Sequence, residues 1–447
     1  MRAIGNLVLA AAYRVIRAIG GSDLVDRFYG MKRVAIIGGG LAGLTCAYAL
    51  KQRGMEAVVF DASPLQGGRA RTEHRDGFTV DAGAQYLLDP ELFRNTFRLI
   101  RDLGLSSDIL PIAPHAGQVY KGKIYRYSVA SALGLLKFKG LNIADKALLP
   151  RMAYLLARYS PQLDFHHPEH GLDFDDETVA SFAKRELSQN VLNYVAGPLI
   201  STLFFYGSEE TSKLLYLLLA RHMYNTRIST LQGGIGRVTA RLSQETSIVA
   251  GGPVATVVAD GSSYVIETQR FSNVVVAAPG DAVLGIAGME ELLSESDREF
   301  FRNCRYQQVV TLAIGTDHPV DGKCYGVSIP RVENFTAATI SFHDYMDPTR
   351  VPKGCGLLAI TGGGENVSAD RLMEDLQRLY RIEPRFTKAY KWRSGMPKFP
   401  PGRYRDITAF RKRVRRAGLF FCGDYLMGPF VEAAITTGLE AADAIKV

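Results

Sequence analysis

Three glycines follow a short apolar strand in the stretch RVAIIGGGLAGLTCAYAL, residues 33–50. Their spacing is Gly38-x-Gly40-x-x-Gly43, and the apolar residues after them recur at helical intervals. In such a strand–turn–helix unit the first glycine allows a tight turn, the second lets a phosphate approach the backbone, and the third lets helix pack close to strand. The helix N-terminus adds unpaired N–H groups and a partial positive charge. The residues expected to contact a phosphate ligand are Gly38, Gly40, Leu41, Ala42 and Gly43.

An acidic residue ends the next predicted strand. Residues 57–60 are apolar, and Asp61 follows them about 20 residues beyond Gly40. A carboxylate at that distance accepts hydrogen bonds from a ribose 2′-OH and repels a 2′-phosphate. The strand, turn, helix and acid together predict a dinucleotide of the NAD or FAD type and disfavour NADP.

A second glycine turn comes soon after this acid, in QGGRARTEHRDGFTVDAGAQYL, residues 66–87. Gly67 and Gly68 allow another close backbone approach, and Arg69 brings positive charge to it. A nicotinamide enzyme has no need of a second loop at this point, whereas the ribityl chain and ring system of FAD extend away from the first turn. The segment therefore favours FAD.

The pattern of strand, GxGxxG, acid, GGR and GF.vD.GA resembles the superfamily of FAD-dependent amine oxidases, protoporphyrinogen oxidases and phytoene desaturases. The family's C-terminal pattern is similar to GLFFCGDYLMGPFVEAAITTGLEAADAI, residues 418–445, and its middle return to the FAD domain resembles residues 233–279. The resemblance implies an α/β fold in which a Rossmann-like FAD-binding domain is interleaved with an α+β substrate domain. It also implies cofactor contacts at Ala62, Gly68, Arg69, Gly83, Ala84, Val254, Gly423, Asp424 and Val431.

The C-terminal motif supports this assignment on physical grounds. Gly423 allows a close approach after an apolar strand, and Asp424 can bond the ribityl or pyrophosphate region. A helix predicted to begin near Val431 would direct its positive N-terminus at a reduced flavin, which carries negative charge. The alternative for Asp424 is a helix N-cap with no ligand.

The three matching segments predict the domain organisation, with residues 1–30 as a separate amphipathic helix. The substrate domain is expected to place helices over a mixed sheet, because its first part has helical apolar spacing and its second reads as strands. The predicted FAD-binding domain comprises residues 31–110, 225–285 and 402–447, and the substrate domain comprises 111–224 and 286–401.

The N-terminal segment and the net charge of +8 are compatible with binding to an anionic membrane surface. Apolar residues between Ile4 and Ile19 fall on one helical face, which suits either an interfacial membrane helix within residues 1–20 or packing on a protein surface. Five scattered cysteines with no CxxC motif indicate a reducing compartment, so we expect a cytoplasmic protein with peripheral membrane contact. The basic run RKRVRR, residues 411–416, is interpreted as a solvated surface, and no nucleic-acid partner is expected.

Deletion of residues 1–28 tests the membrane interpretation. The shortened protein should keep its flavin, because the predicted cofactor motifs begin later, but should bind anionic vesicles more weakly. Sedimentation with vesicles measures this, and unchanged binding would rule the N-terminal membrane helix out.

The predicted substrate pocket departs from the amine oxidase branch of the superfamily. That branch has a lysine on a central strand, where this chain has Gln307 and Gln308 in RYQQVVTLAIG. Its two aromatic cage positions fall on Phe399 and Phe430, more apolar than the usual tyrosines, although both rings could equally be core. These departures disfavour amine oxidation. Residues 324–364 and the helical segments between 172 and 220 resemble the protoporphyrinogen oxidase and desaturase branches more closely. This resemblance implies hydride removal from a C–C or C–N bond of a large hydrophobic substrate, porphyrinogen-, polyene- or natural-product-like.

Two other functions stay open: a flavin amine or amino-acid oxidase, and a prenyl carrier of the GDP-dissociation-inhibitor type. The sequence identifies no catalytic base, electron acceptor or oligomeric state. Three histidines in DFHHPEH match no standard metal spacing and are expected in an exposed loop, so no metal is predicted. No role is assigned to Tyr206, His222 or Tyr224, and Cys422 is interpreted as apolar packing.

Overall fold

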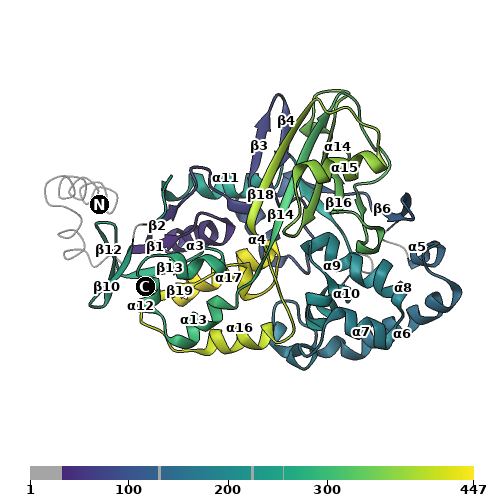
Figure 1. Ribbon diagram of the computed structural model, residues 1–447. Coiled ribbons are helices and arrows are strands. Elements are labelled where there is room, and N and C mark those ends of the chain that lie inside the picture. Colours follow the sequence, from purple (N-terminus) through teal and green to yellow (C-terminus); the bar gives the residue numbers. More distant parts are fainter. Residues whose placement is uncertain (1–32, 129–131, 223–225, 255, 447) are drawn as a thin grey trace.

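The computed structural model describes residues 33–128, 132–222, 226–254 and 256–446. The predicted N-terminal helix, residues 1–30, lies outside this range. A parallel sheet with its helices occupies one side of the molecule, and a larger mixed sheet above a group of helices occupies the other (Figure 1). No helix within the described residues is long and apolar enough to cross a membrane.

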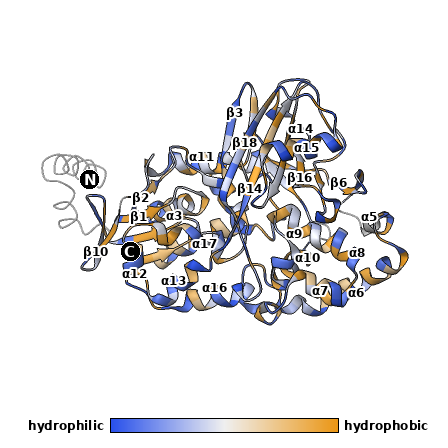
Figure 2. Ribbon diagram, viewed as in Figure 1, coloured by the Kyte–Doolittle hydropathy of each residue, from blue (hydrophilic) through white to orange (hydrophobic). Residues whose placement is uncertain are grey.

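The parallel sheet combines strands from distant parts of the chain, in the order β19-β13-β1-β2-β9. All five residues of β1 are buried, as expected for a central parallel strand covered on both faces. Figure 2 shows these strands as predominantly hydrophobic. The strands are β1 (Arg33–Ile37), β2 (Glu56–Asp61), β9 (Ser247–Ala250), β13 (Asn273–Val276) and β19 (Leu419–Phe421).

Two helices pack against each other beside this sheet, and each begins at a predicted cofactor motif. They are α3 (Leu41–Gln52) and α17 (Val431–Ala444). Gly438 permits the contact, since a side-chain carbon there would collide with the carbonyl oxygen of Ala42. Further elements on this side are α4 (Arg94–Asp102), α11 (Gly236–Gln244), α12 (Met289–Leu292), α13 (Glu295–Arg302), α16 (Arg403–Lys412), and the small sheet β10 (Val257–Asp260), β11 (Ser263–Ile266) and β12 (Gln269–Phe271).

The second sheet has seven strands in the order β18-β14-β17-β16-β15-β6-β7, antiparallel except where β15 meets β6. Residues 286–401 supply five of these strands, in line with the strand pattern expected there, whereas the helical pattern of residues 111–224 did not indicate the two strands that this segment contributes. The strands are β6 (His115–Tyr120), β7 (Lys123–Ser128), β14 (Tyr306–Thr316), β15 (Gly326–Ser328), β16 (Ala337–Phe342), β17 (Gly356–Gly363) and β18 (Phe386–Pro397). The helices α14 (His343–Met346) and α15 (Ala369–Leu379) adjoin this sheet (Figure 1).

Two short antiparallel pairings and a layer of helices complete the fold. The pairings are β3 (Thr72–Arg75) with β4 (Phe78–Asp81), and β5 (Ile109–Pro111) with β8 (Ser229–Leu231). The helical layer lies below the seven-stranded sheet in Figure 1. It consists of α5 (Ala132–Lys137), α6 (Ile143–Tyr159), α7 (Val179–Glu186), α8 (Gln189–Val191), α9 (Gly197–Phe204) and α10 (Lys213–Ala220).

Candidate functional site

Two of the three glycines in the first turn are required by the protein's own packing. Gly38 has a φ of +118°, and a side-chain carbon on it would lie 2.7 Å from the carbonyl oxygen of Ala277. On Gly43 such a carbon would collide with the carbonyl oxygen of Gly38. Gly43 therefore lets the helix pack closely on the turn, as the spacing predicted, whereas Gly38 also makes room for the segment that follows β13.

Gly40 is different, because nothing in the protein requires a glycine there. Its backbone is extended, with φ −78°, and a side-chain carbon would meet no atom within 4 Å. Gly40 forms a β-bridge with Gly67 of the second turn, so the two glycine turns lie side by side. The open space beside Gly40, next to the uncapped N-terminus of α3, fits a phosphate of the expected dinucleotide.

Asp61 is held at this turn by backbone groups. It ends β2, and its carboxylate accepts hydrogen bonds from Gly39 N at 2.5 Å and Ser63 N at 2.7 Å. Ala62, which follows, is exposed. The acid therefore stands at the carboxyl ends of the parallel strands, where such sheets bind nucleotides.

Arg69 ties the second turn to the C-terminal motif. Its guanidinium pairs with the Asp424 carboxylate at 2.8 Å and donates to the carbonyl of Gly395 at 2.8 Å. Burial opposes the charge of Arg69, but Asp424 more than compensates, so the pKa of the guanidinium is raised. Asp424 thus serves as an ion-pair partner, and the N-cap alternative is not what the structure shows. Gly83 and Ala84 close the same corner, since the Ala84 N–H donates to the Arg69 carbonyl at 2.9 Å.

The helix α17 begins at Val431, as predicted, and its N-cap residue Phe430 forms no side-chain cap. Val431 precedes Gly438, the contact point with α3, by roughly 10 Å of helix at 1.5 Å per residue. Two uncapped helix N-termini therefore lie on the order of 10 Å apart on one packed helix pair. This arrangement fits an elongated ligand that carries phosphate at one end and developing negative charge at the other.

The side chain after Val431 reaches a neighbouring helix. Glu432 is fully buried, and its carboxylate accepts hydrogen bonds from Asn95 N at 2.9 Å and Thr96 N at 2.8 Å, at the start of α4. Burial raises the pKa of Glu432. These bonds fix the first turn of α17, a function that the sequence did not indicate.

The prediction of an exposed histidine loop is wrong for His166. Its side chain is only 7% exposed, and its Nδ1 lies 3.7 Å from the Glu432 carboxylate. Burial, with a contribution from Arg94, lowers the pKa of His166 to about 4, so the ring is neutral at neutral pH. His167 and His170 are exposed, and within the described part of the chain no group of three or more His, Cys, Asp or Glu side chains is placed to hold a metal.

Phe430 lies in an aromatic cluster between the parallel sheet and the helical layer. Its half-buried ring is 4.9 Å from Phe165, 5.5 Å from Phe204 and 6.5 Å from Phe93, measured between ring centroids. Three of these four rings are buried, and the partly accessible face belongs to Phe430 itself. The structure thus places an apolar surface directly before the N-terminus of α17.

The other two predicted pocket residues are placed differently. Phe399 is 0% exposed and packs against Tyr404 at 5.2 Å, so its ring is core and we do not retain it as a pocket residue. Gln308 is exposed at a bulge in β14, where its carbonyl accepts from Gly364 N, while Gln307 is buried. The sequence could not show which of the two glutamines is buried, because a bulge shifts the alternation of inward and outward side chains along a strand.

A buried cluster of charged residues lies next to the Gly83–Ala84 turn, because Asp81, which belongs to it, comes two residues before Gly83. Arg350 is fully buried and donates to the Asp81 carboxylate at 2.6 Å and to Thr230 Oγ1 at 2.9 Å. Its Nε lies 3.4 Å from the buried Asp347 carboxylate. His343 is fully buried beside them, and burial, with Arg350, lowers its pKa to about 3. The Arg350 guanidinium therefore links three segments that are distant in the sequence, one of which leads directly into the turn that carries Gly83.

The remaining candidates have structural surroundings. Val254 is half-buried in the loop after β9, and Tyr206 is buried and donates to the Pro397 carbonyl at 3.3 Å. Burial raises the pKa of the Cys422 thiol well above its usual range, in keeping with apolar packing. Burial also lowers the pKa of His222, and Tyr224 lies outside the described residues. In the basic run, Arg413 and Arg415 both pair with Asp297, so part of it is bound to the protein surface.

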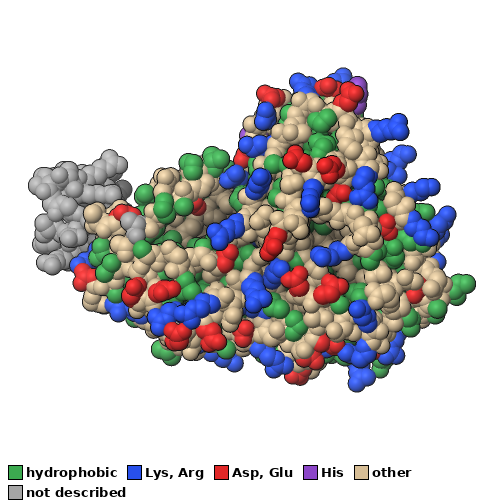
Figure 3. Space-filling view, in the orientation of Figure 1, with side chains coloured by type: hydrophobic (Ala, Val, Ile, Leu, Met, Phe, Trp, Pro, Cys, Tyr) green, Lys and Arg blue, Asp and Glu red, His purple; other side chains and the backbone are tan. Residues whose placement is uncertain are grey.

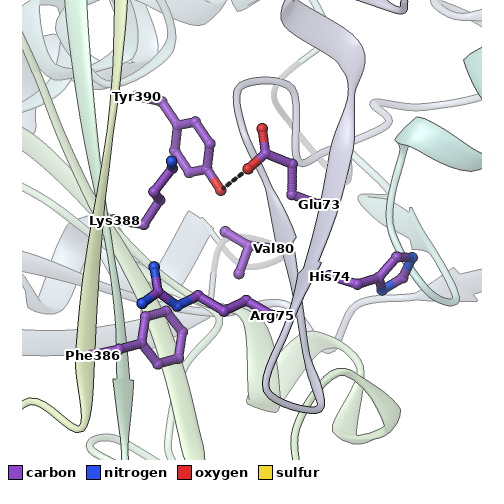
Figure 4. Close-up of a pocket in the computed structure, with 7 residues that line it drawn as sticks. All are labelled: Glu73, His74, Arg75, Val80, Phe386, Lys388 and Tyr390. Carbon is purple, nitrogen blue, oxygen red and sulfur yellow. Dashed lines mark hydrogen bonds between the residues drawn. The ribbon is translucent and has the colours of Figure 1, made fainter. Parts of the chain in front are cut away.

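A small surface pocket lies between the β3–β4 hairpin and β18, away from these residues (Figure 4). It has a volume of about 250 Å³ and mixed charge, and the Tyr390 hydroxyl donates to Glu73 across it at 3.2 Å. None of the predicted site residues lines it, so we do not assign it to the substrate. Its lining residues are Glu73, His74, Arg75, Val80, Phe386, Lys388 and Tyr390.

Comparison with known proteins gives similarity over nearly the whole chain. Residues 41–446 match the family model described as flavin containing amine oxidoreductase. The chain is 23% identical to a coproporphyrinogen III oxidase of Bacillus subtilis, covering 93% of this chain and 98% of that protein. It is 38% identical to a zeta-carotene-forming phytoene desaturase of Myxococcus xanthus, but over only 15% of this chain and 13% of the other. The fold is similar to cyclohexylamine oxidase of Brevibacterium oxydans, with a TM-score of 0.73, 17% identity and coverage of 93% and 98%.

Proposed function

The chain belongs to the family of flavin-containing amine oxidoreductases, and from this premise we propose that it dehydrogenates a large, largely apolar substrate of the porphyrinogen type. It is an FAD-dependent oxidoreductase. When bound, FAD supplies at N5 the acceptor for a hydride or an electron pair. The residues proposed to hold it are the two glycine turns with Asp61, the Arg69–Asp424 pair, and the N-termini of α3 and α17.

The observation that carries the substrate class is the aromatic cluster at Phe430. The ring stands one residue before α17 and is surrounded by Phe93, Phe165 and Phe204. The accessible face of Phe430, supported by the three buried rings, is apolar and aromatic, which favours a ring system or a polyene over an ammonium group. The net charge of +8 suits the carboxylates that a porphyrinogen carries.

Two comparisons bear on the choice between porphyrinogen and polyene. The similarity to a coproporphyrinogen oxidase runs along almost the whole chain, whereas the similarity to a phytoene desaturase is confined to a short part. We therefore place the porphyrinogen first and the polyene second. An amine or amino-acid substrate is disfavoured because β14 contains no lysine. Nothing found supports the prenyl-carrier alternative.

The test is anaerobic mixing of the flavoprotein with a porphyrinogen, a polyene and an amine in turn. A substrate should bleach the flavin band at about 450 nm, because two-electron reduction removes that absorbance. We expect the porphyrinogen to bleach it fastest. Bleaching by the polyene alone would select the second candidate, and bleaching by the amine alone would refute the proposed substrate class.

A further inference from the structure

The outward face of α6 carries an apolar stripe. Ile143 is 88% exposed and Tyr154 is 60% exposed, whereas large apolar residues on the outside of a helix are usually scattered singly. Of the small apolar residues that are exposed on this helix, three lie on the same face as Ile143 and Tyr154. Their spacing of three or four residues places all five on one line along the helix. The stripe consists of Ile143, Ala147, Pro150, Tyr154 and Ala157.

Basic residues flank this stripe on both sides. By helical angle Lys146 lies on one side, and Arg151 and Arg158 lie on the other. Arg151 also pairs with Glu186 of α7 at 2.5 Å, so Lys146 and Arg158 carry most of the positive charge at the two edges. The single acid of α6, Asp145, is buried and accepts hydrogen bonds from Ser188 and Asn190, so it is directed inward. The outward face is therefore apolar in the middle and cationic at its edges.

The helix that precedes α6 in the chain also exposes an apolar and a basic side chain. In α5, Leu136 is 46% exposed and Lys137 next to it is also exposed. Figure 3 shows lysine and arginine side chains interspersed with hydrophobic ones at the side of the molecule where Figure 1 places α5 and α6.

We propose that this face of α6 docks on an anionic lipid surface, with the helix lying in the plane of the interface. An amphipathic helix with an apolar face and lysine or arginine at its borders binds in this way, since the apolar side chains enter the headgroup boundary while the cations meet lipid phosphates. A planar lipid surface can contact the apolar stripe and the basic residues on both of its sides at the same time. If the proposed function is correct, docking of α6 would bring Phe165, which follows the end of this helix in the chain, closer to a substrate dissolved in the membrane.

The experiment is sedimentation of the full-length flavoprotein with vesicles of phosphatidylcholine, with and without phosphatidylglycerol. The natural protein should bind the anionic vesicles more strongly, and added salt should weaken that binding. Ile143→Glu with Tyr154→Glu should lower the affinity by about tenfold or more, because two charges replace the apolar contacts. Equal flavin content in the variant shows that it is folded.

The control is Val414→Glu. Val414 is 99% exposed and also lies among basic residues, but it stands alone, and Arg413 and Arg415 beside it pair with Asp297. It should bind as the natural protein does. The proposal would be overturned if the double variant bound anionic vesicles as strongly as the natural protein, or if the control lost as much affinity as the double variant. It would also be overturned if the natural protein did not bind anionic vesicles. A change of oligomeric state in the double variant without vesicle binding would instead assign the stripe to a second copy.

These measurements need no substrate, so they are independent of the proposed chemistry. A protein that binds anionic vesicles through α6 but oxidises no porphyrinogen would retain the docking surface and lose the substrate assignment.

Discussion

Replacing Gly40 with valine is expected to abolish FAD retention and leave the polypeptide folded. The extended backbone of Gly40 is one that valine adopts readily, and a side-chain carbon there meets no protein atom within 4 Å. The substitution therefore costs the protein itself little, while it fills the space proposed for a phosphate. The ratio of flavin absorbance to protein should fall to background in the purified variant, with circular dichroism unchanged.

A matched control is Gly322→Val. Gly322 is exposed and lies in a loop of the other half of the molecule. As at Gly40, a side-chain carbon on it would meet no atom within 4 Å. It should retain a full complement of flavin. In Gly43→Ala, by comparison, the alanine side chain would collide with the carbonyl oxygen of Gly38, so this variant should lose stability as well as flavin. Full flavin occupancy in Gly40→Val would show that the phosphates bind elsewhere.

The substitution Arg350→Met is expected to cause the largest loss of stability. It leaves the carboxylates of Asp81 and Asp347 buried without their cation, and removal of one partner from a buried ion pair costs about 3–5 kcal/mol. Because Asp81 immediately precedes the turn that carries Gly83, flavin release should accompany the loss. Urea unfolding of the flavoprotein, followed by circular dichroism and by free flavin fluorescence, measures both.

Two further variants separate the ion cluster from a general effect of arginine removal. Arg302→Met removes an exposed arginine that pairs with exposed Glu295, and it should have little measurable effect. Asp81→Asn combined with Arg350→Met should recover part of the lost stability, because one uncompensated charge is removed. If Arg350→Met were no worse than Arg302→Met, the cluster would not be what holds the cofactor turn.

The cofactor turns were predictable from the sequence because their causes are local. Gly43 is needed by a contact within one strand–turn–helix unit, Gly38 has the positive φ of a tight turn, and Asp61 ends the strand beside it. The helix that begins at Val431 was also predicted, since apolar spacing and a preceding glycine-rich turn suffice to indicate it. Each of these patterns is written in a few consecutive residues.

The predicted pocket shows where such reasoning stops. Phe399 and Phe430 were equivalent as sequence positions, yet the first is sealed in the core and the second is partly accessible. His166 read as part of an exposed loop, but the chain folds it against Glu432, far along the sequence. Which side of a ring or a loop faces solvent depends on what other segments cover it.

The sequence by itself determined the glycine-rich turn, the acid beyond it, the family and the cofactor, because the backbone conformations involved depend on neighbouring residues. Only the tertiary structure decided that Arg69 pairs with Asp424, that Arg350 neutralises Asp81, and that one face of α6 is left uncovered. Each depends on contacts between residues far apart in the chain. Burial and charge pairing come from those long-range contacts, and no local pattern records them.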